Sequence, residues 1–286
     1  MKKQYILVGI DGSAITDSLL QYAVWLAQSN GMAIKLLHTI EHTHTSENPH
    51  HEGNLTPNIR RELLSELSQS EHDTNKALLA QGKEIIRLAK HKVLAAGVEN
   101  VLTQLRHGSL PEAVADLEDE TLLLMLGAKG TDHQADSKGL GYHLEQAIKA
   151  TSKPVFIVKT AFTRPQTVLF AYNGSPTAKR ALEMLTRETM YQEPLAFHVV
   201  CVNSDQQLAQ NLVSEAKNAL KQNNKVTTTV YTSGDTLKLL TDYQQNNSID
   251  LTAMGAFSHG KLHGFFFGSF TTKMIQQSRT NFLLIR

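Results

Sequence analysis

The chain carries the same order of segments twice, and this internal repeat restricts the possible folds more than any other feature of the sequence. Residues 5–13 (YILVGIDGS) match residues 167–175 (TVLFAYNGS), and residues 35–41 (KLLHTIE) match residues 197–203 (FHVVCVN). Both pairs are separated by the same 162 positions. Self-similarity at a fixed separation is typical of a duplicated structural unit.

A second set of matches lies in the last part of each copy, and its members are separated by fewer positions. Residues 122–130 (LLLMLGAKG) match residues 250–258 (DLTAMGAFS), 128 positions apart, and residues 154–159 (PVFIVK) match residues 281–286 (NFLLIR), 127 positions apart. The first copy therefore contains an insertion of about 35 residues after its second apolar run. We expect this insertion to form a polar loop followed by a long helix that starts near Asn58.

Each copy alternates short apolar runs with longer amphipathic stretches. In the first stretch, helical spacing links four residues, Leu19, Tyr22, Ala23 and Leu26, and Gly31 is expected to end the helix. Apolar runs without alternation are typical of parallel strands that are covered on both faces. We therefore predict an α/β fold made of two tandem doubly wound domains, each with a mainly parallel sheet of about five strands.

The boundary between the two domains is expected in the polar segment 159–166, which contains Pro165. We place the domains at residues 1–162 and 163–286. A linker this short leaves little freedom, so the domains should pack on each other.

Charge and composition exclude several classes of partner. The 28 lysines and arginines nearly balance the 27 aspartates and glutamates, so no broad attraction to nucleic acid or to an anionic membrane is expected. The first apolar run is too short for a signal sequence or a membrane span, and we expect a cytoplasmic protein. The single cysteine, Cys201, lies in an apolar run and is interpreted as a buried small side chain.

Residues 255–271 (GAFSHGKLHGFFFGSFT) indicate a phosphate site. They satisfy all but the last position of G-x-x-x-x-G-K-[ST], where Leu262 replaces the hydroxyl that would bind magnesium. A P-loop helix should also begin near Lys261, but glycine and phenylalanines interrupt it there. The better interpretation joins Gly255, at a strand exit, to the start of the last helix, whose N–H groups and partial positive charge attract anions.

The pattern G-x-x-G, nine residues, G-[ST], downstream of Asp-Gly-Ser, resembles that of the universal stress protein family, and the duplication resembles its tandem members. The resemblance covers essentially the whole chain. It implies a Rossmann-like sheet in each half and often ATP, with the first-strand aspartate near the adenine. It also implies pairing of the final strands, 154–159 with 281–286, as a pseudo-twofold dimer within one chain. Such pairing would hide two sheet edges.

Each copy departs from the family pattern, and the second departs less. Ser258 replaces the second glycine, Asn173 replaces the aspartate, and the rest of the spacing is kept. The candidate nucleotide-binding residues of the second copy are Asn173, Gly174, Ser175, Val202, Gly255, Ser258, Gly268, Ser269 and Thr271. We favour ATP, with Mg²⁺ as a possible companion, at this copy.

The first copy keeps Asp11, Gly127 and Gly130, but its next loop has ten residues, and Gly141 is followed by Tyr142 and His143 instead of a hydroxyl. Asp132 and Asp136 in that loop would repel a polyphosphate.

Other interpretations remain open. The Gly-Ser pairs after each first strand are also typical turn and helix-cap residues, and the chain could be a nucleotide-independent scaffold or bind another small ligand. Ser13 and Ser175 lie outside a G-x-S-x-G elbow, so binding is expected rather than turnover. A zinc site is conceivable in the inserted loop, which contains His42, His44, His50 and His51 with Glu41, Glu47 and Glu52, although a solvated loop is favoured.

Overall fold

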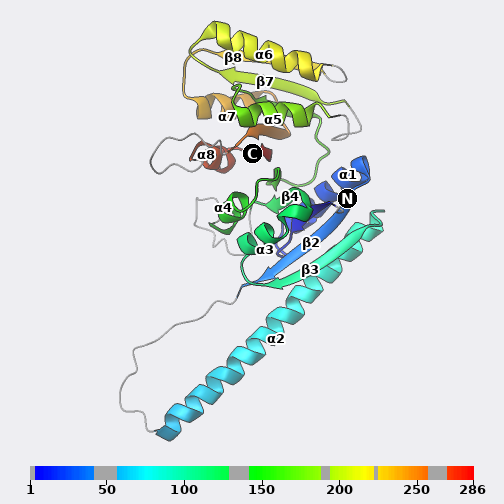
Figure 1. Ribbon diagram of the computed structural model, residues 1–286, viewed down its shortest axis with the longest axis vertical. Helices are drawn as coiled ribbons and strands as arrows, with labels where there is room; N and C mark the ends of the chain where they lie inside the picture. The colour runs from blue at the N-terminus through cyan, green and yellow to red at the C-terminus, as the bar shows by residue number, and fades with distance from the viewer. Residues whose placement is uncertain (1–3, 42–56, 129–141, 188–193, 222–224, 257–268) are drawn as a thin grey trace.

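The structure, a computed structural model, describes residues 4–41, 57–128, 142–187, 194–221, 225–256 and 269–286; the side chains of 57–72, Tyr142 and Ser269 are outside the description. The described residues form one ten-stranded sheet with helices on both faces (Figure 1). No helix in this part of the chain combines the length and the apolar character needed to cross a lipid bilayer.

The elements of the two repeats follow the same order. The first repeat consists of β1 (Tyr5–Gly9), α1 (Thr16–Asn30), β2 (Ala33–Ile40), α2 (Pro57–Ala95), β3 (Val101–His107), α3 (Leu110–Asp116), the 3₁₀ turn η1 (Glu118–Glu120), β4 (Thr121–Gly127), α4 (Tyr142–Lys149) and β5 (Val155–Val158). The second consists of β6 (Thr167–Ala171), α5 (Pro176–Leu185), β7 (Ala196–Val202), α6 (Gln206–Leu220), β8 (Lys225–Tyr231), α7 (Thr236–Asn246), β9 (Leu251–Gly255), α8 (Ser269–Gln277) and β10 (Asn281–Ile285).

The strand order is β3-β2-β1-β4-β5-β10-β9-β6-β7-β8. All pairs within a repeat are parallel, and the repeats join where β5 and β10 pair antiparallel, with Phe156 opposite Leu283. Both the predicted parallel α/β architecture and the pairing of the final strands are confirmed. The chain order reverses between β1 and β4 and again between β6 and β9, which is where doubly wound sheets bind ligands. Because the strands of the two repeats run in opposite directions, these two switch points lie at opposite ends of the strands. Each lies at the edge that the carboxyl ends of its own repeat's strands form.

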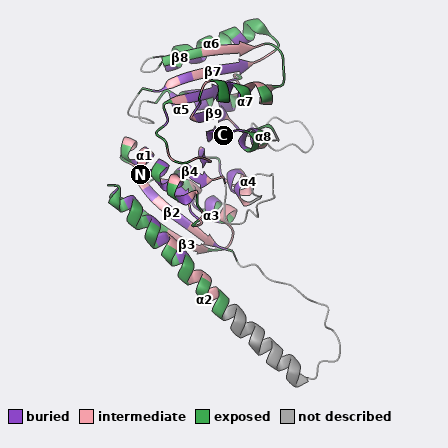
Figure 2. Ribbon diagram, turned by 180° about the vertical axis from the view of Figure 1, so that it is seen from behind, coloured by how far each residue is buried: buried purple, intermediate pink, exposed green. Residues whose placement is uncertain are grey.

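The hydrophobic core forms two clusters, which alternate residues along the strands assign to the two faces of the sheet. Figure 2 shows the buried residues along the strands and on the helices. Tyr22 of the first repeat and Phe170 of the second belong to one cluster, and Leu124 and Phe282 belong to the other. Each cluster thus spans both repeats. The domain boundary expected between residues 162 and 163 stays a prediction from the sequence.

Helix α1 follows its sequence pattern closely. Leu19, Tyr22, Ala23 and Leu26 are all buried, and Gly31 ends the helix with a left-handed φ of 62° and an N–H bond to the carbonyl of Ala27. This φ favours glycine because a side chain there would be strained.

Helix α2 is the predicted long helix of the insertion and begins one residue before the predicted Asn58. Its second half packs on β2 and β3 through Ile86, Ala89 and Val93, while its first half projects beyond the sheet (Figure 1). Gly82 allows the close approach, because a Cβ there would lie 2.9 Å from Cδ2 of His38.

Candidate functional site

The candidate site of the second repeat lies at the switch point between β6 and β9. These strands are neighbours, with Ala171 opposite Met254, so their exits at Asn173 and Gly255 lie at the same edge. Helix α8 begins at Ser269. The predicted site residues Ser258 and Gly268 lie outside the described residues.

Gly255 has a packing role at the end of β9. A Cβ built there would lie 2.5 Å from the backbone nitrogen of Ala178 and 2.7 Å from the carbonyl carbon of Thr177, both in the first turn of α5. Real Cβ atoms do not approach backbone atoms this closely. The absence of a side chain therefore lets the amino end of α5 pack directly on the strand exit.

The turn after β6 uses its predicted site residues for local structure. The Oδ1 atom of Asn173 accepts a 3.1 Å hydrogen bond from the Ser175 nitrogen, and Ser175 caps α5 by accepting from the nitrogen of Ala178 at 3.2 Å. Gly174 has a φ of +70°, and Leu212 of α6 lies against it. The turn-and-cap interpretation of these residues is confirmed, although a cap does not prevent the same loop from contacting a ligand.

The remaining predicted residues of this repeat lie around the same edge. Val202 is half-buried at the end of β7, and Thr271, in the first turn of α8, is only 4 % exposed. The next residue after β7, Asn203, accepts a 2.9 Å bond from the nitrogen of Asp205.

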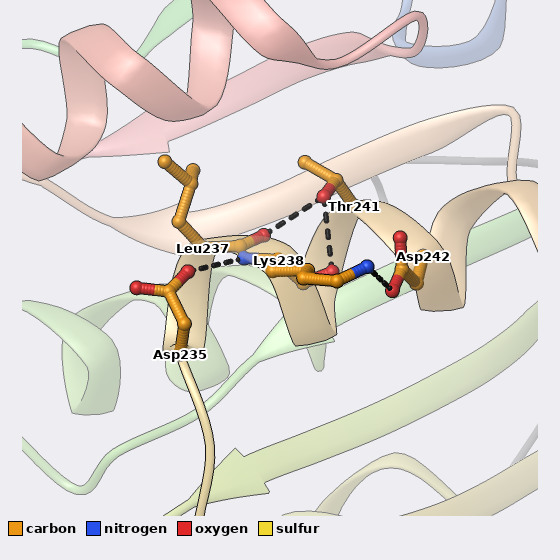
Figure 3. Close-up of polar contacts among 5 residues, drawn as sticks. All are labelled: Asp235, Leu237, Lys238, Thr241 and Asp242. Atoms are coloured by element: carbon orange, nitrogen blue, oxygen red, sulfur yellow. Dashed lines mark hydrogen bonds and ion pairs between the residues drawn. The ribbon is translucent and has the colours of Figure 1, made fainter.

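Helix α7 starts at this edge too, and its charged side chains are engaged within the helix (Figure 3). Asp235 caps it by accepting a 2.7 Å bond from the nitrogen of Lys238. The ammonium of Lys238 lies 2.7 Å from Asp242, which raises the pKa of Lys238. In this arrangement the helix offers no cation directed to the switch point.

The first repeat has the same turn, but the expected helix cap is not found there, because α1 has Ile15 at its N-cap position and no side-chain cap bond. Asp11 accepts bonds from the Ser13 nitrogen at 2.9 Å and from the Thr16 hydroxyl at 3.2 Å. Gly12 has a φ of +76°, with Ile85 of α2 lying against it. Gly127 ends β4, and Gly130 lies outside the described residues.

A carboxylate lies between two helix starts in the first repeat, which the sequence reasoning missed. Oε1 of Glu41 lies 3.4 Å from the nitrogen of Leu110, at the start of α3, and 3.4 Å from Nδ1 of His143, at the start of α4. The equivalent residue in the second repeat is the uncharged Asn203. The sequence contains a signal for this contact, because Glu41 ends the second apolar run of the first copy, whereas Asn203 ends that of the second.

The metal hypothesis concerns mostly residues that are not described. His42, His44, His50, His51, Glu47 and Glu52 lie outside the described residues, and Glu41 contacts His143. Within the described ranges, no group of three potential metal ligands comes together.

Comparison with known proteins gives consistent matches over the full length. The family model described as the universal stress protein family matches residues 4–159 and again 165–286. The universal stress protein Slr1230 of Synechocystis sp. is 29% identical over 286 residues, covering 98% of this chain and 99% of that protein.

Two solved structures share the fold. A universal stress protein from Archaeoglobus fulgidus superposes with a TM-score of 0.70 at 18% identity, over 99% of this chain and 97% of that one. A putative universal stress protein from Pseudomonas aeruginosa superposes with a TM-score of 0.56 at 13% identity, over 100% of this chain and 93% of that one. With two matched repeats that together span nearly all of its residues, the chain belongs to the universal stress protein family.

Proposed function

We propose that the second repeat binds an adenine nucleotide, ATP in the first place, and that the protein acts in the stress response by binding rather than by turnover. The observation that supports this most is the position of α8. It begins at Ser269, 14 residues after Gly255 at the end of β9, and residues 255–271 keep the family's spacing. Its amino-terminal N–H groups offer donors and partial positive charge for phosphates.

The preference for the second repeat rests on the charges at the two switch points. In the first repeat, the carboxylate of Glu41 lies beside the start of α4, where it would repel a phosphate group. The second repeat has Asn203 at this position, and its side chain bonds within its own loop. At the position of Glu41, a polyanion therefore meets no carboxylate in the second repeat.

Mg²⁺ would accompany a bound triphosphate and neutralise part of its charge. No described residue is assigned to it. The cytoplasmic location and the absence of a nucleic-acid or membrane partner remain predictions from the sequence.

Equilibrium dialysis with labelled ATP tests the proposal. We expect one saturable site per chain, which Gly268→Glu weakens by placing a carboxylate at the start of α8. The matched control is Gly141→Glu, the equivalent change before α4, which should leave binding unchanged. Absence of saturable binding at about millimolar nucleotide, a standard free energy of about −4 kcal/mol, would refute the proposal.

A nucleotide-independent scaffold is the second candidate. It is favoured by the local bonds that occupy Asn173 and Ser175 and by the packing of Leu212 on Gly174. Purified protein that carries stoichiometric ATP would exclude it. The zinc-regulator hypothesis also remains a proposal, and metal analysis before and after deletion of residues 42–52 tests it.

A further inference from the structure

The residues that follow the two central strands occupy equivalent positions in the repeats. Lys159 follows β5, and Arg286 follows β10, 127 positions later. Since β5 and β10 are antiparallel neighbours, each of these cations reaches the repeat to which it does not belong.

Lys159 binds the carboxyl end of α8. Its ammonium donates to the backbone carbonyls of Ile275 and Ser278. The last carbonyls of a helix have no partner within the helix and carry partial negative charge, so a cation there satisfies and stabilises them.

Arg286 makes the equivalent contact in the other direction. Its Nη1 atom donates to the carbonyls of Ile148 and Lys149, each at 3.1 Å, and to that of Thr151, at the end of α4. Ile148 corresponds to Ile275, and Thr151 corresponds to Ser278, at the same separation of 127 positions. The two cations thus cap two equivalent helices reciprocally.

A buried hydrogen-bond network fixes the backbone at Lys159. Asn281, 1 % exposed, accepts from the nitrogen of Lys159 at 2.8 Å and donates to the hydroxyl of Tyr22 at 2.9 Å. The Tyr22 hydroxyl in turn donates to the carbonyl of Thr163 in the linker at 3.1 Å. Lys159 therefore extends to α8 from a backbone that β10, α1 and the linker hold together.

We propose that Lys159 of the first repeat is a positioning residue for the nucleotide site of the second repeat. The inference rests on the proposed function, because it concerns the same site. Helix α8 has 9 residues and is about 13 Å long, so fixing its carboxyl end also fixes the direction in which its amino end points. The first repeat, whose own motif is broken, then contributes to the site by holding α8.

The test compares Lys159→Met with Arg286→Met. Each variant keeps an unbranched side chain and removes one cation from the carboxyl end of a helix. Only Lys159 contacts α8, the helix that carries the candidate site. We expect Lys159→Met to weaken ATP binding about tenfold, in line with the loss of a charged hydrogen bond, and Arg286→Met to change it less than about twofold. Lys159→Arg should restore binding, because Arg286 shows that a guanidinium can make these contacts.

Hydrogen–deuterium exchange gives a readout that does not depend on nucleotide. Lys159→Met should speed exchange in residues 270–278 and leave 143–151 unchanged, and Arg286→Met should do the reverse. If ATP binds and both methionine variants weaken it equally, Lys159 acts through general stability and the inference is overturned, while the proposed function stands. If the unaltered protein binds no ATP, the proposed function fails and the positioning role fails with it, whereas exchange still decides whether Lys159 holds α8.

Discussion

Gly255→Ala tests whether the strand-exit glycine is required for packing. The new methyl group would meet two backbone atoms of α5, the nitrogen of Ala178 at 2.5 Å and the carbonyl carbon of Thr177 at 2.7 Å. Backbone atoms at a helix start cannot rotate away, so α5 or β9 must shift by about 1 Å to reach ordinary contact distances. Overpacking of this kind costs about 2–3 kcal/mol.

The matched control is Gly9→Ala, at the end of β1. Its methyl group would meet Cδ2 of Leu126 at 2.7 Å, the end of a side chain that can change rotamer. The equivalent residue of the second repeat is Ala171, so this position accepts a methyl group in the same fold. We expect a loss below about 1 kcal/mol.

Thermal unfolding followed by circular dichroism measures both variants. At about 2–4 °C per kcal/mol, Gly255→Ala should lower the melting temperature by about 4–12 °C, and Gly9→Ala by less than about 4 °C. Equal losses in the two variants would show that the packing of α5 on Gly255 does not restrict this position. The glycine would then have to be explained by contact with a ligand.

Two further predictions concern histidines in the sheet, His198 in β7 and His38 in β2. Burial and the nearby charge of Lys225 lower the pKa of His198, whose Nδ1 lies 3.0 Å from the Tyr243 hydroxyl. Since the unfolded chain then binds more protons, stability should fall as the pH drops below about 6.5, and denaturant unfolding should show a smaller fall for His198→Gln; equal slopes would contradict this. Gly82→Ala should gain about 1 kcal/mol of helix propensity but lose more, because the methyl group meets His38, whose ring is held by a 2.7 Å contact between Nδ1 and the carbonyl of Ile10. A net gain in urea unfolding would refute that reasoning.

The sequence predicted those parts of the fold that depend on local patterns, which occur in both repeats. The helical spacing of Leu19, Tyr22, Ala23 and Leu26 and the stop at Gly31 are borne out because burial and backbone conformation act within a few residues. The burial of Cys201 follows from its place in an apolar run, and it raises the pKa of the thiol. The pairing of the final strands came from the family resemblance, and the β5–β10 ladder confirms it.

The candidate site was less predictable because its contacts join distant segments. Nothing in the spacing of residues 255–271 indicates that Gly255 packs on α5, since Ala178 is far away in sequence. The contact of Glu41 with His143 likewise depends on α4 and β2 meeting at one edge. The match between residues 154–159 and 281–286 makes Lys159 equivalent to Arg286. Only the antiparallel junction shows that each side chain reaches the other repeat.

The junction between β5 and β10 also gives a physical reason why the second repeat needs the first, although the first repeat departs more from the family motif. The switch points lie at opposite ends of the strands, so a ligand at one has no direct contact with the other. The described contacts between the repeats lie at β5, β10, α1, the linker and the ends of α4 and α8. An isolated second repeat would expose β10, all of whose residues are buried, as an unpaired edge. It would also lose the cation at the end of α8. A site built on that helix therefore depends on the first repeat even if the first repeat binds nothing itself.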